Sequence, residues 1–339
     1  MNNMIELSVI MPIFNSSKYL RKTLESAISF FGNEIDKGEI LLIDDGSTDS
    51  SVSIAKEFKN KIPQIKIIEA KHEGVSSSRN IGILKAKGKY ITFFDSDDLF
   101  LENYFNKFRT MIKENPDIIL TDIETLKSDS FICDLDDNLR LNMMKLVLRG
   151  RGNMGISSKF YKTKFIKENS LYYNKKIIIG EDMLFILKAI SYCKSIYLSP
   201  SKYYFIPKSH TLNRYHKDFY DSERELEEEI NNLLRLYKNE ILINYICNRI
   251  KINGLKNFID CYYAPLFFNK MLSLRESAEM LKKTIYEFDY KPALYAKGFS
   301  RELGKRLKLY RFFIRKGRYK SVFIINNVFL KLKMIRRNK

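Results

Sequence analysis

The sequence has few of the residues that build zinc sites and disulfide frameworks. It contains four cysteines, and no two of them stand at C-x-x-C spacing. Its three histidines include no H-x-x-x-H pair. A structural zinc site is therefore not expected. Because nothing in the pattern suggests disulfide bonds, the reducing cytoplasm is the expected compartment.

Long apolar runs are also missing. No stretch reaches the roughly 18 apolar residues that a bilayer-spanning helix needs. The first residues lack a basic leader, and their apolar run is too short for a signal peptide. A length of 339 residues and an apolar content of 45% are ordinary for a folded protein with one large core or two smaller ones. The sequence predicts a protein that is soluble or lies on a membrane surface.

The net charge of +19 is concentrated near the C-terminal end. Residues 297–339 carry a net charge of +14, with Glu302 as their one acid, whereas the first 296 residues carry only +5. Apolar residues recur at helical spacing in this basic tail, in two stripes: Leu303, Leu307, Tyr310 and Ile314, then Val322, Ile325, Phe329 and Leu332. Basic amphipathic helices bind anionic membrane surfaces, and the sequence favours that partner. Helices packed on the catalytic domain and a partner-binding or oligomerising segment remain alternatives.

Residues 5–94 alternate between short apolar runs and amphipathic stretches. The runs are predicted strands: Leu7–Met11, Ile40–Ile43, Ile65–Ile68 and Tyr90–Phe94. The stretches between them are predicted helices: Lys18–Phe30, Asp49–Lys59 and Ser76–Lys87. This alternation predicts an α/β fold with a parallel sheet covered on both faces. Ligands of such sheets gather beyond the carboxyl ends of the strands, so the segments that follow these strands are expected to share one crevice.

Later segments predict further elements and a division of the chain. We expect a helix near 99–114, a strand at 118–121, a polar loop at 127–138 and mainly helices after residue 220. The acidic run Glu223–Glu229 is interpreted as the solvated first turns of a helix. The expected domains are a catalytic domain at 1–210, with a nucleotide-binding half at 1–98 and an acceptor half at 99–210, then a helical region at 211–296 and the basic tail at 297–339.

Three carboxylates directly follow the apolar run at 90–94. Asp95, Asp97 and Asp98 are crowded enough to repel one another unless a cation lies among them. Carboxylate oxygens are the ligands that Mg²⁺ and Mn²⁺ prefer, and an ion held by one or two acids keeps open positions for phosphates. The alternative is an acidic loop that caps the following helix.

Charged residues stand at two further strand-to-helix junctions. Asp44 and Asp45 end the second strand with nothing local to satisfy them, and a carboxylate there can accept a hydrogen bond from the N3–H of a pyrimidine. Arg79 lies one turn inside the helix that Gly74 opens, where a guanidinium can bind phosphate or an acid. An exposed arginine paired with Asp45 or Asp95 is the alternative.

Four segments together resemble a known family. SVIMPIFN, LLIDDGSTDSS, GVSSSRNIG and YITFFDSDD, beginning at residues 8, 41, 74 and 90, are similar to the family 2 inverting glycosyltransferases of the GT-A fold, of the bacterial surface-polysaccharide type. They occur in the family's order and spacing over about residues 5–98, with a weaker likeness to about 210. The resemblance implies a Rossmann-like, mostly parallel sheet with a helical C-terminal extension.

The resemblance also implies roles for individual residues. Asp182, beside Glu181, would be the general base that removes the acceptor's hydroxyl proton. Asp95 and Asp97 would hold Mn²⁺ or Mg²⁺ on the diphosphate. The residues implied to bind the nucleotide are Pro12, Ile13, Phe14, Asn15, Asp44, Asp45, Arg79, Asp95 and Ser96. One departure is His72, since family members often carry Asn there. His210 could contact metal or phosphate, or be a solvent-exposed loop residue.

The expected function is transfer of a hexosyl or N-acetylhexosaminyl group from a UDP-sugar, with inversion, to a hydroxyl of a lipid-linked or other surface glycan. The enzyme would be cytoplasmic and peripheral on the inner face of the membrane, and its helical C-terminal part could join copies of the chain. A nucleotidyltransferase is the alternative enzyme, although no Gly-rich basic loop follows the first strand. A nucleic-acid-binding protein would explain the charge, but no recognition motif accompanies it, so nucleic acid is not an expected partner.

Overall fold

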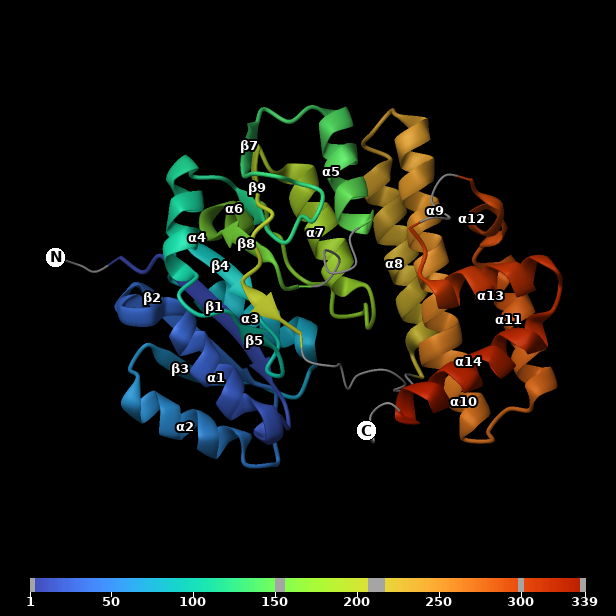
Figure 1. Cartoon of the computed structure of the whole chain (residues 1–339), viewed down its shortest axis with the longest axis horizontal. Coiled ribbons are helices and arrows are strands. Elements are labelled where there is room, and N and C mark those ends of the chain that lie inside the picture. Colours follow the sequence, from blue (N-terminus) through green and yellow to red (C-terminus); the bar gives the residue numbers. More distant parts are fainter. Residues whose placement is uncertain (1–3, 150–155, 207–216, 298–301, 336–339) are drawn as a thin grey trace. The chain divides into compact units, whose positions relative to one another are not determined.

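The chain folds into two compact units, Met1–Lys208 and Ser209–Lys339 (Figure 1). The structure is a computed structural model that describes residues 4–149, 156–206, 217–297 and 302–335. His210 lies outside these residues. So does the G-x-G-x-x-G match at 150–155, which follows a predicted helix and is therefore not expected to bind a dinucleotide. Among the described helices, none has the length and apolar character needed to cross a membrane.

An eight-stranded mixed sheet forms the centre of the N-terminal unit. Its strand order is β3-β2-β1-β4-β8-β6-β9-β7, and the first four strands are parallel. β8 runs antiparallel between β4 and β6, while β6 and β9 are parallel to each other. The strands are β1 Leu7–Ile13, β2 Gly38–Asp44, β3 Ile65–Glu69, β4 Tyr90–Phe93, β6 Ile118–Leu120, β7 Ser130–Cys133, β8 Lys159–Lys162 and β9 Ser195–Leu198. The predicted α/β class with a mostly parallel sheet is confirmed.

Helices connect these strands, as the sequence alternation predicts. They are α1 Ser17–Phe31, α2 Ser51–Lys61, α3 Val75–Lys85, α4 Phe105–Met111, α5 Asp137–Arg149, α6 Thr163–Glu168 and α7 Glu181–Tyr192, with short 3₁₀ turns at Gly32–Lys37 and Ile112–Glu114. A separate two-stranded sheet pairs β5 Leu99–Phe100 with β10 Tyr204–Phe205. In α1, Leu20, Leu24 and Ala27 lie on one buried face, because they repeat at the helical period.

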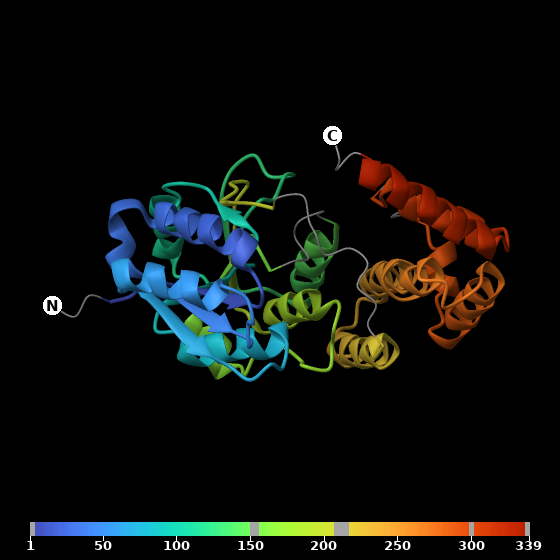
Figure 2. The ribbon, with the colours of Figure 1, turned by 90° about the horizontal axis from the view of Figure 1, so that it is seen from below.

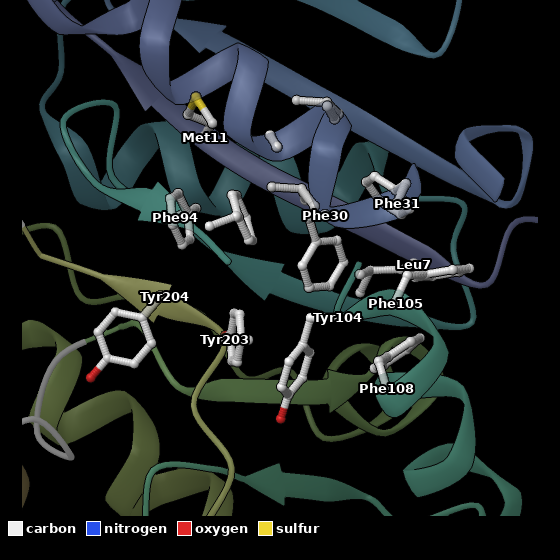
Figure 3. Close-up of a cluster of buried hydrophobic side chains, with 14 of the residues drawn as sticks. Leu7, Met11, Phe30, Phe31, Phe94, Tyr104, Phe105, Phe108, Tyr203 and Tyr204 are labelled. Atoms are coloured by element: carbon white, nitrogen blue, oxygen red, sulfur yellow. The ribbon is translucent and has the colours of Figure 1, made fainter. Parts of the chain in front are cut away.

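Aromatic side chains fill the core beside β1 and β4 (Figure 3). The ring of Phe94, the residue after β4, stacks on Phe100 at a centroid distance of 3.5 Å. Phe30 of α1 contacts Phe100 and Tyr203 in the same cluster. Burying aromatic rings on both sides of a chain segment fixes its backbone. The loop that follows β4, which carries Asp95, therefore starts from a rigid point.

Two sequence predictions in this unit are wrong in detail. The segment 127–138 is not only loop, because β7 pairs antiparallel with β9 at the sheet edge. Three of its four residues are exposed, and its apolar run of Phe131, Ile132 and Cys133 is short and flanked by acidic and polar residues, so the segment resembles a loop in the sequence. The helix expected near 99–114 begins at Phe105, because Leu99 and Phe100 pair with β10 instead.

The C-terminal unit is helical (Figure 2). Its helices are α8 Phe219–Leu234, α9 Glu240–Asn257, a π-helical segment Phe258–Tyr263, α10 Ala264–Phe268, α11 Leu274–Glu287, α12 Lys291–Tyr295, α13 Lys305–Arg315 and α14 Tyr319–Ile335. α14 packs on α11 and α13.

The first apolar stripe of the basic tail belongs to the core of this unit. Leu307, Tyr310 and Ile314 of α13 are buried, as is Leu303 before it. Arg306 forms an ion pair with buried Asp260. The interpretation that this stripe faces a membrane is therefore wrong, since its side chains are already covered by protein. The second stripe is partly covered: Val322 is buried, whereas the Leu332 side chain lies outside the described ones.

The acidic run of α8 is not solvated throughout, contrary to the sequence interpretation. Glu223 is buried and accepts a hydrogen bond from the Tyr290 hydroxyl at 3.1 Å, while its Oε2 has no partner among the described protein atoms. Burial raises the pKa of Glu223 from its ordinary 4.5 to about 7. The carboxyl group is thus neutral in the folded unit under mildly acidic conditions.

This pKa predicts that the C-terminal unit loses stability as the pH rises through the interval between 4.5 and about 7. In that interval the folded unit keeps the Glu223 proton and the unfolded chain does not, so the loss reaches up to about 3 kcal/mol. Glu223→Gln should remove it. The variant should melt above the native protein at about pH 8 and close to it at about pH 5. Exposed Glu228→Gln is the control, and equal pH responses in all three proteins would contradict the prediction.

Candidate active site

The carboxyl ends of β1, β2 and β4 meet at one edge of the sheet, as predicted. Ile13 lies opposite Asp44, and the Asp45 N–H donates to the Ile13 carbonyl at 2.9 Å. The Phe94 N–H donates to the Ile10 carbonyl at 3.0 Å. Beyond the strands, the hydroxyls of Ser16 and Ser96 are 2.6 Å apart. Three segments of the implied nucleotide site are therefore in mutual contact.

The residues after β1 have different roles in this edge. The Ile13 side chain lies in the core, so only its backbone is available to a ligand. Asn15 adopts a left-handed conformation (φ 49°), and its side-chain oxygen accepts from the Thr48 N–H at 2.8 Å. Asn15 therefore fastens the β1 loop to the β2 loop. Pro12 is half-buried, and Phe14 is 42% exposed at the rim.

Asp44 has a local partner, so the expectation that nothing local satisfies it is wrong, whereas the partners of Asp45 come from a distant segment. Asp44 accepts from the Ser47 N–H at 3.2 Å. Asp45 accepts from the N–H groups of Glu73 and Gly74 at 3.1 and 3.0 Å, and thereby covers the start of α3. Both carboxylates are buried. Each oxygen retains lone-pair capacity, so the proposed contact with a pyrimidine N3–H is compatible with these bonds.

His72 lies beside Phe14, a contact that the sequence did not predict. The two rings stack at a centroid distance of 4.4 Å with an interplanar angle of 27°. His72 Nδ1 is 2.7 Å from the Asp45 carbonyl oxygen, which suits an N–H donor. The pair provides an exposed aromatic surface next to Asp45. Residues far apart in sequence form it, so local pattern gave no signal.

Arg79 connects three carboxylates at the centre of the site. Its side chain is only 3% exposed, unlike the exposed arginine considered from the sequence. One terminal nitrogen lies 2.8 Å from Asp182 Oδ1 and 3.3 Å from Glu181 Oε1. The other lies 3.3 Å from Asp95 Oδ1. The helix of Glu181 and Asp182 is thus joined to the end of β4 through one guanidinium.

This arrangement sets the proton affinity of Asp182. Burial raises the pKa of Asp182 well above its ordinary value, and the positive charge of Arg79 opposes that rise. The charges of Glu181 and Asp95 raise it further. Asp182 is therefore a carboxylate of increased basicity that Arg79 helps to keep ionised, which is the property required of a general base.

An apolar cluster holds the two halves of this polar centre. Phe93, two residues before Asp95, contacts Tyr173 and Phe185 at centroid distances of 5.3 and 5.5 Å. Tyr173 stacks at 4.4 Å on Phe185, which lies three residues after Asp182. The Arg79 guanidinium lies 5.1 Å from the Tyr173 ring centroid. These contacts fix β4 and α7 relative to each other beside the Arg79 guanidinium.

Lys159 is a buried cation close to these acids, and sequence reasoning missed it. Its Nζ donates to the Ser157 carbonyl at 3.0 Å. Burial lowers its pKa to about 7, although the charges of Asp182 and Asp122 oppose that shift. Lysines are usually exposed, so the sequence gave no indication that Lys159 is buried.

The acids after β4 fit a divalent cation by their chemistry. Burial, followed by the charges of Asp95 and Asp97, raises the pKa of Asp98 to about 7. Burial is the largest cause of this rise, and a cation would relieve the smaller part that comes from the charges of Asp95 and Asp97. Asp95 is about half exposed. No group of three or more His, Cys, Asp or Glu side chains is arranged to hold a metal in the described part of the chain. The fit is thus to an ion held by one or two acids and completed by phosphates.

A family model described as Glycosyl transferase family 2 matches residues 8–191, more than half of the chain. The chain belongs to glycosyl transferase family 2. The resemblance drawn from the four motifs is confirmed, and the nucleotidyltransferase alternative is set aside.

Curated relatives of this family member include bacterial glycosyltransferases. The poly(ribitol-phosphate) beta-N-acetylglucosaminyltransferase TarS of Staphylococcus aureus (strain Mu50) is 29% identical over 288 residues, which cover 75% of this chain and 46% of TarS. EpsH of Bacillus subtilis (strain 168), named as a glycosyltransferase, is 26% identical over 279 residues, covering 75% of this chain and 80% of EpsH. The chain thus spans about half the length of TarS.

The fold is also similar to solved structures. The crystal structure of S. aureus TarS residues 1–349 in complex with UDP-GlcNAc aligns with a TM-score of 0.63 at 20% identity, covering 96% of this chain and 92% of that one. The complex with UDP aligns with a TM-score of 0.60 at 19% identity and covers 96% and 91%. The expected GT-A fold with a helical C-terminal region is confirmed.

Proposed function

We propose that this family 2 member transfers a hexosyl or N-acetylhexosaminyl group from a UDP-sugar to a hydroxyl of a cell-surface polymer, with inversion at the anomeric carbon. The observation that carries this proposal is the Arg79 centre, which joins Asp95 at the end of β4 to Asp182 at the start of α7. The relative TarS is named for N-acetylglucosamine transfer to poly(ribitol-phosphate), and its structures with UDP and UDP-GlcNAc support the choice of donor.

The donor would occupy the edge where β1, β2 and β4 end. Asp45 accepts from the N3–H of uracil, and the Phe14–His72 ring pair offers a stacking surface for the base. Asp95 and Ser96 contact the ribose. Arg79 is covered by three acids, so it acts on the donor through Asp95 and not as a direct diphosphate ligand.

Asp95 and Asp97 would hold Mn²⁺ or Mg²⁺ in this site. When bound, the ion would offset the charge that develops on the departing diphosphate. The neighbouring Asp98 is buried, and its Oδ2 accepts a hydrogen bond from the Ser157 hydroxyl at 3.2 Å. Its raised pKa leaves Asp98 partly neutral near pH 7, so Asp95 and Asp97 are the acids assigned to the ion.

Asp182 supplies the base for the chemical step. As the acceptor hydroxyl oxygen attacks the anomeric carbon, its proton passes to the Asp182 carboxylate, the bond from that carbon to the diphosphate breaks, and UDP departs with the electron pair. A single attack from the opposite face inverts the configuration. The positive charge of Arg79 favours the ionised form of Asp182 before the step and remains beside it afterwards.

The acceptor is proposed to be a lipid-linked or other surface glycan reached from the cytoplasmic face of the membrane. The basic tail supports a peripheral location on anionic lipid. We also propose that copies of the chain associate through the C-terminal helices.

A panel of UDP-GlcNAc, UDP-glucose and GDP-mannose tests the donor class, with release of nucleotide as the readout. Turnover of the GDP-sugar alone would overturn the assignment of a UDP-sugar donor.

The role of Asp182 predicts a specific kinetic defect. Asp182→Asn should lower sugar transfer by roughly 10²–10⁴-fold, the usual contribution of a general base. UDP affinity, measured by calorimetry, should change little because Asp182 is not assigned to the nucleotide. Asp221→Asn, an exposed change on α8, is the control. Near-normal transfer by Asp182→Asn would remove Asp182 from the mechanism.

The role of Asp97 predicts a metal-dependent binding defect. Asp97→Ala should weaken UDP binding by at least about tenfold in the presence of Mn²⁺, because a charge-bearing ligand of the ion is lost. With EDTA present, the variant and the native protein should bind UDP with similar affinity. Calorimetry under both conditions makes the comparison. An equal loss with and without Mn²⁺ would show that Asp97 does not hold the ion.

A further inference from the structure

α13 has one face in the core and one face in solvent. The core face carries Leu307, Tyr310 and Ile314. Arg311 is also buried and donates to the Leu294 carbonyl. The apolar stripe of the basic tail and Arg311 are thus committed to the fold. Neither is available to an outside partner.

The opposite face of α13 is exposed, and we call it the outer face. Its members recur at helical spacing and are all exposed: Lys305, Lys308, Leu309, Phe312 and Lys316. Arg315 is also exposed, but its Nε donates to the Leu294 carbonyl at 2.7 Å, so it is not counted as part of this face. Leu309 is 38% and Phe312 is 53% exposed. Two apolar side chains therefore lie among three lysines on one side of the helix. No acidic residue follows Glu302 in the sequence.

α14 packs beside α13 and adds a second exposed stripe (Figure 1). Lys320, Ile324 and Val328 recur at a spacing of four and are all exposed. Ile324 is 51% and Val328 is 52% exposed. Val322, which the sequence pattern places in the second apolar stripe, is buried, whereas Ile324 and Val328, which lie alongside that stripe in the pattern, are exposed.

We infer that the outer face of α13 is the surface through which the protein binds an anionic lipid bilayer. Exposed cations supply the attraction to lipid headgroups, and Leu309 and Phe312 can insert at the boundary with the acyl chains. A nucleic acid would use the cations but would gain little from an exposed leucine at their centre. The charge pattern and the apolar pair together favour the bilayer.

This inference rests on the proposed membrane location but replaces the residues that the sequence suggested. It also separates the lipid surface from the fold. Lys305, Lys308 and Lys316 have no ion-pair partner in the part of the chain that the structure describes. They can therefore be changed without removing a structural contact. Arg306, Arg311 and Arg315 each make a structural contact and cannot be changed in this way.

The test uses the full-length protein and vesicles of phosphatidylglycerol and phosphatidylcholine in equal parts. Lys305→Gln with Lys308→Gln and Lys316→Gln should bind about 100-fold more weakly than the native protein, since three charges near an anionic surface are lost. The control triple, Lys238→Gln, Lys270→Gln and Lys282→Gln, removes the same charge from exposed positions of the same unit and should bind nearly as the native protein does.

The apolar part of the surface needs its own pair of variants. Leu309→Ser with Phe312→Ser should weaken vesicle binding about tenfold at unchanged net charge. Leu236→Ser with Ile241→Ser, which are also highly exposed, should not weaken it. Equal losses in outer-face and control variants would overturn the inference, because binding would then follow net charge or general hydrophobicity.

Two further readouts distinguish lipid binding from donor binding and from nucleic-acid binding. UDP affinity should be the same in all variants, because none of the changed residues is assigned to the donor site. If the native protein binds vesicles but not UDP, the proposed function is contradicted and the lipid-binding surface is still supported. Duplex DNA at the same salt concentration should bind more weakly than anionic vesicles. Retention on DNA that the outer-face variants abolish, without vesicle binding by the native protein, would assign the face to nucleic acid instead.

Discussion

The ion pairs of Arg79 are the interaction on which the site depends. A buried guanidinium meets three carboxylates, of which Asp95 is about half exposed. A buried charge is tolerated in a fold only when opposite charges lie close to it. The two terminal nitrogens of Arg79 meet that condition from α3 by contacting Asp182, Glu181 and Asp95, while its buried Nε has no hydrogen-bond partner among the described residues. Through the same contacts, the implied base Asp182 and the first acid after β4, Asp95, lie on the two terminal nitrogens of one guanidinium. Structural and chemical requirements therefore coincide in one residue.

The apolar surroundings give this polar centre its rigidity. Phe93 and Phe94 are adjacent, and because strand side chains alternate they pack in opposite directions, toward Phe185 and toward Phe100. The end of β4 is held from both sides, so Asp95 starts from a fixed backbone. On one side the packing also reaches α7, where Asp182 begins the helix. A donor site that must align a diphosphate with a base benefits from such preorganisation.

The sequence predicted the features that depend on local pattern and strand order. Apolar runs that end in acids identified β2 and β4. The rule that ligands bind beyond the carboxyl ends of parallel strands correctly predicted that these ends lie at one edge of the sheet. It could not predict that Arg79 is buried, because that depends on α7, about a hundred residues later. Glu223 looked solvated for the same reason, since Tyr290 covers it from a distant segment. The sequence pattern pointed to the lysines of the outer face of α13 but not to its apolar residues, Leu309 and Phe312. Two amphipathic faces share this helix, and only packing shows which one is covered.

The pH dependence of donor turnover tests the central claim most directly, namely that Arg79 keeps Asp182 ionised. Arg79→Gln removes the positive charge that opposes the raised pKa of Asp182, so the acid limb of the kcat/KM profile should move to higher pH by about one unit or more. Arg79→Lys keeps the charge and should leave the limb near its native position, even if turnover falls. A uniform loss of activity in both variants, with the acid limb unmoved, would contradict the account and leave Arg79 with a purely structural role.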